Sequence, residues 1–246
     1  MARAKCHPVH VVREPGLLRL RLARGDRYNA LDIATLQALA MALTPPHGVV
    51  PVLILEGEQG VFSVGPDIAQ LSTMDGAHAA AFSRLAHAVA DLIEAWPAPT
   101  IANLAGYCLG SALEIALACD VLIAVTEVRL GLPGLAWAMV PCAGGLRRLA
   151  QRVDGETTSR LFLNGEVLDG ADALRIGLVD RLVDSPYACE TLAAELNEYG
   201  PSAVQAIRSI RLARQGAIDS SSEASLFAQP FASGECQKRL KALLAG

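Results

Sequence analysis

The sequence predicts an α/β fold whose strands and helices are layered around one large core. Strand and helix patterns alternate through the first 145 residues, and such alternation is typical of α/β proteins. Beyond that point the strand pattern nearly vanishes and helical patterns follow one another. The chain has 246 residues, of which 52% are hydrophobic, so it can bury a sizeable core. We therefore expect a core over residues 1–185 and a helical C-terminal region over residues 186–246.

The first 145 residues divide into short strands and helices. Period-two or β-rich patterns predict strands at 9–14, 17–23, 51–57, 100–105 and 120–125. Apolar residues at helical spacing predict helices at 31–43 and 73–96. Pro97 and Pro99 end the second of these, because proline cannot continue a helix. A turn rich in small residues precedes a further short helix, and the Gly and Pro density of 128–145 predicts a loop around a short apolar turn.

The remaining residues predict helices and one short strand. The helices are expected at 145–153, 156–164, 169–177, 189–198, 203–215 and 223–244, and the strand at 178–183. Helical tails of this kind often close an active site or form an oligomer contact.

Composition excludes several classes of function. The net charge of -4, without a Lys/Arg block, argues against a nucleic-acid partner. The six cysteines and five histidines lack metal-like spacing, so we expect reduced thiols, a cytoplasmic location and no metal. No signal peptide is expected at the N-terminus. The apolar segment 101–125 is interrupted by Asn103, Glu114 and Asp120, which favours a buried helix and strand over a membrane span.

Glu114 is the first candidate for chemistry. It lies in the run GSALEIALACD, which has no polar face to carry it into solvent. A surface position or a salt bridge is the usual explanation of a single glutamate in a helix. Here the neighbours predict a shielded carboxylate whose neutral form is favoured, which raises its pKa toward the range useful for proton transfer. We therefore expect Glu114 to act as a general acid or base.

The turn before Glu114 is the second candidate. Small residues in GYCLGSA lead into the helix, whose first N–H groups have no intrahelical acceptor. Such donors can hold an oxyanion while a proton moves at the adjacent carbon. Tight packing alone would also explain Gly110.

Five segments in order resemble the enoyl-CoA hydratase/isomerase, or crotonase, superfamily. They are RGDRYNALD near Asn29, LEGEQGVFSVGPDIAQL at 55–71, PAPTIANLAGYCLGSALEIALACDVLIAV at 97–125, VRLGLPGLAWAMVPCAGGLRRLAQRVDG at 128–155 and NGEVLDGADALRIGLVDRLV at 164–183. The resemblance implies a crotonase-like spiral of ββα turns with a helical C-terminal region. It also implies homotrimers or dimers of trimers and an acyl-CoA thioester as substrate, with no other cofactor and no metal.

The resemblance assigns roles to individual residues. Glu114 matches the catalytic glutamate that helps to activate water for attack on C3, and Ser111 matches the residue, usually glycine, whose N–H forms half of the oxyanion hole. The expected substrate-binding residues are Arg27, Asn29, Gly65, Asp67, Ile68, Gly110, Gly134, Trp137 and Cys142. A lysine that often approaches CoA phosphate in this family is replaced by Ala69 and Gln70, for which Arg24 and Arg27 could compensate. Lys238 and Lys241 are candidates for CoA contacts from a neighbouring subunit.

Two positions depart from the family pattern. Pro66 occupies the place of the second oxyanion donor, and proline has no backbone N–H. A shifted loop that offers the Asp67 N–H, or a water molecule, could replace it. Gly134 stands where the family places its second catalytic glutamate, which delivers a proton to C2 in hydratases and is also needed by Δ3,Δ2-isomerases. Cys142, where glycine is commoner, could lie near the thioester or be inert packing.

The sequence therefore predicts an enoyl-CoA hydratase with a degenerate site that lacks the second glutamate. Hydration of crotonyl-CoA is expected well below the rate of a two-glutamate enzyme. Two alternatives stay open: a non-catalytic acyl-CoA or acyl-carrier binding protein, and a specialised isomerase or decarboxylase that uses one glutamate.

Overall fold

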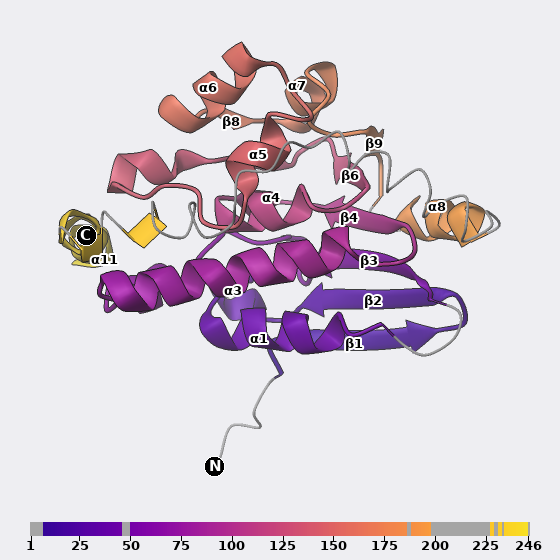
Figure 1. Ribbon diagram of the computed structural model, residues 1–246. Helices are drawn as coiled ribbons and strands as arrows, with labels where there is room; N and C mark the ends of the chain where they lie inside the picture. The colour runs from indigo at the N-terminus through magenta and orange to yellow at the C-terminus, as the bar shows by residue number, and fades with distance from the viewer. Residues whose placement is uncertain are drawn as a thin grey trace.

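The computed structural model describes residues 7–45, 50–185, 188–197, 227–228, 231–232 and 234–245. Its centre is a six-stranded sheet in the order β1-β2-β3-β4-β6-β9 (Figure 1). The strands are β1 (Val9–Glu14), β2 (Leu17–Leu22), β3 (Val52–Gly57), β4 (Thr100–Leu104), β6 (Val121–Val125) and β9 (Arg181–Val183). The first pair is antiparallel and the other pairs are parallel. All six strands were predicted from the sequence.

A second, three-stranded sheet was missed by the sequence analysis. It consists of β5 (Tyr107–Leu109), β7 (Arg129–Gly131) and β8 (Val167–Leu168). The expected turn before the helix of Glu114 therefore contains β5, and the expected loop 128–145 begins with β7. Strands of two or three residues are too short to show a period-two pattern, so the sequence gives no signal for them.

The two sheets are built by repeated turns of one spiral. β4 and β6 of the large sheet are each followed by a strand of the small sheet, β5 and β7, which are parallel to one another. Likewise β3 is followed by Ser63, which forms a parallel bridge with Cys108 in β5. Gly106 makes the corner between β4 and β5, at φ +56, where a Cβ would lie 2.5 Å from the Gly60 carbonyl oxygen. The predicted spiral is thus present.

Helices cover both faces of the large sheet. The long α3 (Gly76–Glu94) and α1 (Ile33–Ala42) lie on one face and α8 (Ala188–Asn197) on the other (Figure 1). Leu53 and Leu55 of β3 belong to the main core, whereas Val52 and Ile54 pack with Cys189 of α8. This alternation is the period-two pattern of a strand buried on both faces.

Short helices complete the structure. They are η1 (Gly25–Arg27), α2 (Ile68–Leu71), α4 (Ser111–Ala116), η2 (Pro133–Trp137), α5 (Gly145–Leu149), α6 (Gly155–Leu163), α7 (Gly170–Arg175) and α11 (Glu235–Ala245). The helix predicted at 203–215 lies outside the described residues, as does much of the one predicted at 223–244. In the described part of the latter, α11 begins only after Gly234, whose φ of +75 interrupts the predicted continuous helix. The described residues of the C-terminal region are otherwise mainly helical, as expected.

Candidate active site

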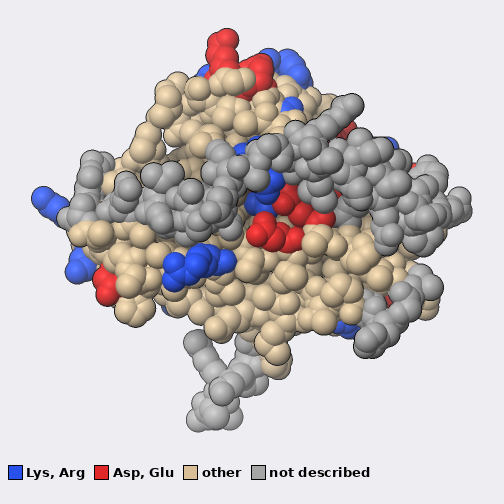
Figure 2. Space-filling view, in the orientation of Figure 1, with Lys and Arg blue, Asp and Glu red and all other residues tan. Residues whose placement is uncertain are grey.

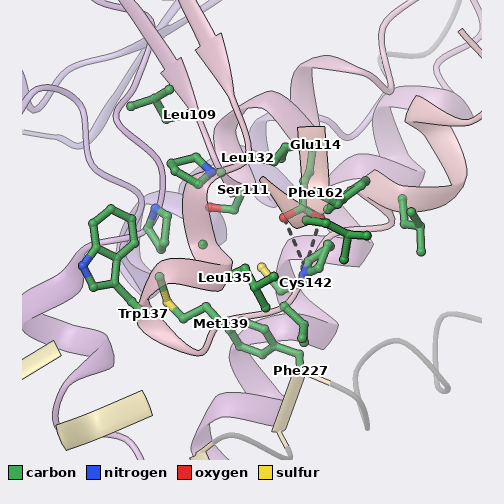
Figure 3. A pocket seen from close by; sticks show the side chains of 18 of the residues that line it. Leu109, Ser111, Glu114, Leu132, Leu135, Trp137, Met139, Cys142, Phe162 and Phe227 are labelled. Carbon is green, nitrogen blue, oxygen red and sulfur yellow. Dashed lines mark hydrogen bonds between the residues drawn. The ribbon is translucent and has the colours of Figure 1, made fainter. Parts of the chain in front are cut away.

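An apolar cavity of about 480 Å³ lies where α4 meets the loop before α5 (Figure 3). Its volume is within the usual range for small-molecule sites. Among the described residues that line it, Glu114 is the one with a charged side chain. The lining residues are Val64, Pro66, Ile68, Leu109, Gly110, Ser111, Glu114, Leu132, Pro133, Gly134, Leu135, Trp137, Met139, Val140, Pro141, Cys142, Leu146, Thr158, Ser159, Phe162, Leu163, Phe227 and Leu243.

The Glu114 carboxylate is shielded, as the sequence predicted, and is held by backbone donors. The residue is 2% exposed. Oε2 accepts hydrogen bonds from the N–H groups of Cys142 at 3.0 Å, Ala143 at 2.8 Å and Gly145 at 3.0 Å. Such bonds favour the charged form of a carboxylate and oppose the effect of burial. The donors come from a loop 28 to 31 residues later in the chain, so the sequence alone did not reveal them.

Gly145 lets this loop approach the carboxylate. A Cβ at this position would lie 2.2 Å from Cγ of Glu114 and 2.7 Å from its Oε2. Both distances are far below van der Waals contact. A glycine is therefore required here for the close approach, and any larger residue would displace the carboxylate.

The loop is fixed in turn by the long helix α3. The carbonyl oxygen of Cys142 accepts hydrogen bonds from Ser83 Oγ at 2.8 Å and His87 Nδ1 at 2.9 Å. Because a carbonyl oxygen only accepts, Nδ1 of His87 carries a proton. The same peptide unit presents the Ala143 N–H to Glu114, so α3 sets the direction of that N–H. Ser83 and His87 are one helical turn apart on a buried face, a signal that the sequence analysis overlooked.

Arg148 of α5 supports the next peptide unit. Its guanidinium is 1% exposed, donates to the carbonyl oxygen of Ala143, and pairs with Asp91 and Glu94 of α3 at 2.9 Å each. Acidic and basic side chains also lie beside one another near the centre of the surface seen in Figure 2. A buried guanidinium needs such partners, because an unpaired buried charge is costly. The Glu114 site therefore rests on a network that crosses from α3 to α5.

The structure shows how Asp67, next to Pro66, is bonded. Asp67, the expected substitute donor, gives its N–H to the Leu31 carbonyl oxygen at 2.9 Å. Its side chain caps α2 and pairs with Arg24 at 2.9 Å. Burial raises the pKa of the Asp67 carboxyl, but hydrogen bonds from Arg24 and from the Gln70 N–H lower it by a larger amount. The net pKa therefore lies below its ordinary value. In this conformation both the N–H and the carboxylate of Asp67 therefore have partners within the protein.

The remaining predicted residues fall into two groups. Pro66, Ile68, Gly110, Ser111, Gly134, Trp137 and Cys142 line the cavity with Glu114, whereas Arg27, Asn29, Gly65 and Asp67 do not. Asn29 is 1% exposed and donates to the Glu58 and Val61 carbonyl oxygens. Arg27 is exposed. The binding roles of these four residues stay predictions.

Metal and membrane features are absent from the described part of the chain. No group of three or more His, Cys, Asp or Glu residues there could hold a metal ion. No helix there combines the length and apolarity needed to cross a bilayer.

The spiral of strands and the carboxylate in an apolar cavity together define a crotonase-type α/β protein. A family model described as enoyl-CoA hydratase/isomerase matches residues 13–244. The chain belongs to this family.

Three known proteins show the degree of similarity. 2,3-Dehydroadipyl-CoA hydratase of Escherichia coli (strain K12) is 31% identical over 203 residues, which cover 80% of this chain and 79% of that protein. The probable enoyl-CoA hydratase 2, mitochondrial, of Arabidopsis thaliana is 32% identical over 198 residues, or 78% of this chain and 66% of that protein. The crystal structure of enoyl-CoA hydratase from Thermoplasma volcanium GSS1 matches with a TM-score of 0.80 at 26% identity, covering 96% of this chain and 97% of that chain.

Proposed function

We propose that the protein adds water to a 2-enoyl-CoA thioester with Glu114 as its proton-transferring group. One observation carries the proposal: among the described residues, Glu114 supplies the one carboxylate of the cavity, where three backbone N–H groups fix it. A base held in a fixed position is what proton transfer requires. The names of the family relatives, which are acyl-CoA hydratases, agree with this reaction.

The proposed reaction uses one carboxylate twice. Glu114 takes a proton from water as the water oxygen bonds to C3, and the electron pair of the double bond moves toward the thioester oxygen to give an enolate. The enolate then takes a proton at C2 from protonated Glu114, which restores the carboxylate. Gly134 offers no separate acid for this second step. Because a positioned acid contributes about 10²–10⁴ in rate, we expect slower turnover than in a two-glutamate hydratase.

We further propose that the acyl tail is uncharged. The described cavity wall contains no cation and one anion, Glu114. A second carboxylate on the acyl chain would be buried without a partner and close to a like charge, which is costly. The tail thus differs from the dicarboxylic acyl group in the name of the Escherichia coli relative.

Two measurements test the proposal. The first follows loss of the conjugated double bond of crotonyl-CoA and of a longer 2-enoyl-CoA, where we expect measurable hydration well below ~10 per second. A turnover at that ordinary level would show that another group replaces the missing acid. The second compares the Kd values of hexanoyl-CoA and adipoyl-CoA, which have the same chain length. We expect adipoyl-CoA to bind more than about tenfold more weakly, and equal affinities would refute the uncharged tail.

A non-catalytic acyl-CoA binding protein is the second candidate. Gly134 lines the cavity where the family has its second glutamate, and the lack of a carboxylate at this place favours a binding protein without catalysis. Saturable binding of hexanoyl-CoA with no turnover of any 2-enoyl-CoA would move this candidate to first place. The predicted homotrimer or dimer of trimers and the cytoplasmic location stay predictions.

A further inference from the structure

Ser111, which lines the cavity, has a buried hydroxyl group that the family resemblance does not use. The residue is 2% exposed, and its Oγ has no hydrogen-bond partner among the described residues. Leaving a buried hydroxyl unpaired costs about 1–3 kcal/mol. Ser111 and Glu114 are three residues apart on α4, and both line the cavity (Figure 3). An unpaired donor in this place points to an acceptor on a ligand.

The backbone around Ser111 leaves few other donors for that acceptor. Pro66 has no N–H, and it lies against the start of α4, since a Cβ on Gly110 would be 3.4 Å from Pro66 Cδ. The flanking Asp67 N–H is bound to the Leu31 carbonyl oxygen.

Two further N–H groups at this spot are also occupied. The Gly65 N–H is bound to Ser63 Oγ at 3.1 Å, and the Gly110 N–H to the Gly131 carbonyl oxygen at 2.9 Å. The Ser111 N–H, by contrast, precedes the first intrahelical hydrogen bond of α4, which runs from Glu114 N–H to the Gly110 carbonyl oxygen.

We propose that the Ser111 hydroxyl donates a hydrogen bond to the thioester oxygen and replaces the N–H donor lost at Pro66. The N–H and the Oγ–H of one serine then share the acceptor, so one residue supplies both halves of the oxyanion hole. The hydroxyl strengthens its bond as negative charge develops on that oxygen in the enolate. The inference rests on the proposed function, because the acceptor is the oxygen of an acyl-CoA thioester.

The test measures the thioester carbonyl directly. Hexanoyl-CoA labelled with ¹³C at the thioester carbon is bound to wild type, Ser111→Ala and Ser159→Ala, and the carbonyl stretch is recorded by difference infrared spectroscopy. Ser159 is the matched control, because it also lines the cavity but its hydroxyl already donates to the Gly155 carbonyl oxygen at 2.8 Å. The melting temperature of each variant shows that it is folded.

We expect the carbonyl stretch of bound hexanoyl-CoA to lie below that of the free thioester in wild type and in Ser159→Ala, and this downshift to be smaller in Ser111→Ala. We also expect kcat for crotonyl-CoA to fall about 10²–10³-fold in Ser111→Ala, the usual loss of one oxyanion donor. An equal downshift in Ser111→Ala, or no binding of hexanoyl-CoA to wild type, would overturn the proposal. Binding with a Ser111-dependent downshift but no turnover would refute only the hydratase function.

Discussion

Replacing Gly145 by alanine should disable the site without unfolding the protein. The added Cβ would lie 2.2 Å from Cγ of Glu114, 2.8 Å from its Cδ and 2.7 Å from its Oε2. The Gly145 N–H is also one of the three donors that hold this carboxylate. The substitution therefore forces Glu114 away from the loop that positions it.

The structure gives the size of the effect. Carbon atoms in contact are about 3.5 Å apart, so the carboxylate must retreat by roughly 1.3 Å, the difference between about 3.5 Å and 2.2 Å. A displacement of about 1 Å at a reacting group can cost 10²-fold in rate. A lost hydrogen bond to a charged group costs about 1.5–3 kcal/mol. We expect kcat to fall about 100-fold, with the Kd of hexanoyl-CoA changed by less than about tenfold because the apolar walls remain.

The matched control is Gly155→Ala. Gly155 is also the first residue of a helix, α6, and a Cβ there meets nothing within 4 Å. Steady-state hydration of crotonyl-CoA and melting temperatures would be measured for both variants. Wild-type kcat in a folded Gly145→Ala variant would refute the role of this loop in holding Glu114.

Three further predictions concern the residues around the site. Gly134→Glu should raise kcat for crotonyl-CoA by up to about 10²-fold, because it restores the second acid. The position has room for a side chain, since the nearest atoms to an added Cβ are those of Met139, 3.4 Å away. An unchanged kcat with intact binding would contradict the role assigned to the missing carboxylate. Ser83→Ala should lower the free energy of unfolding by about 1 kcal/mol and kcat several-fold, because it removes one of the two donors to the Cys142 carbonyl oxygen and leaves His87 Nδ1 as the other. Denaturant unfolding and steady-state kinetics check this, and a stability loss with unchanged kcat would make Ser83 merely structural. Burial raises the pKa of Glu94, but Arg148 and Arg147 lower it by a larger amount, so the net pKa lies below its ordinary value. The stability this ion pair contributes is therefore present above the unfolded pKa of about 4.3 and lost as pH falls through the folded pKa. Melting temperatures from pH 7 to pH 3 should fall more steeply in wild type than in Glu94→Gln, and parallel curves would contradict the ion-pair effect.

The sequence predicted the large sheet because its strands carry strong patterns. β3 reads VLILEG between turn signals, and α3 has a continuous apolar face. The small sheet was missed because two-residue or three-residue strands have no measurable period. The lack of a polar face around Glu114 correctly predicted its burial.

The partners of Glu114 could not be predicted in the same way. They are backbone N–H groups of Cys142, Ala143 and Gly145, and a backbone donor leaves no trace in residue type. Gly145 did stand out as a glycine, but its reason is a contact made only in the folded chain. Likewise, the occupied N–H of Asp67 depends on the bridge between Leu31 and Pro66.

The most direct test of the central claim is kcat of Glu114→Gln against wild type with crotonyl-CoA, with the Kd of hexanoyl-CoA measured for both. The claim is that this carboxylate moves the protons, and the amide cannot do so although it nearly preserves the shape. The account predicts a loss of about 10²-fold or more in kcat with Kd changed by less than about tenfold. Equal kcat in the two proteins would contradict it.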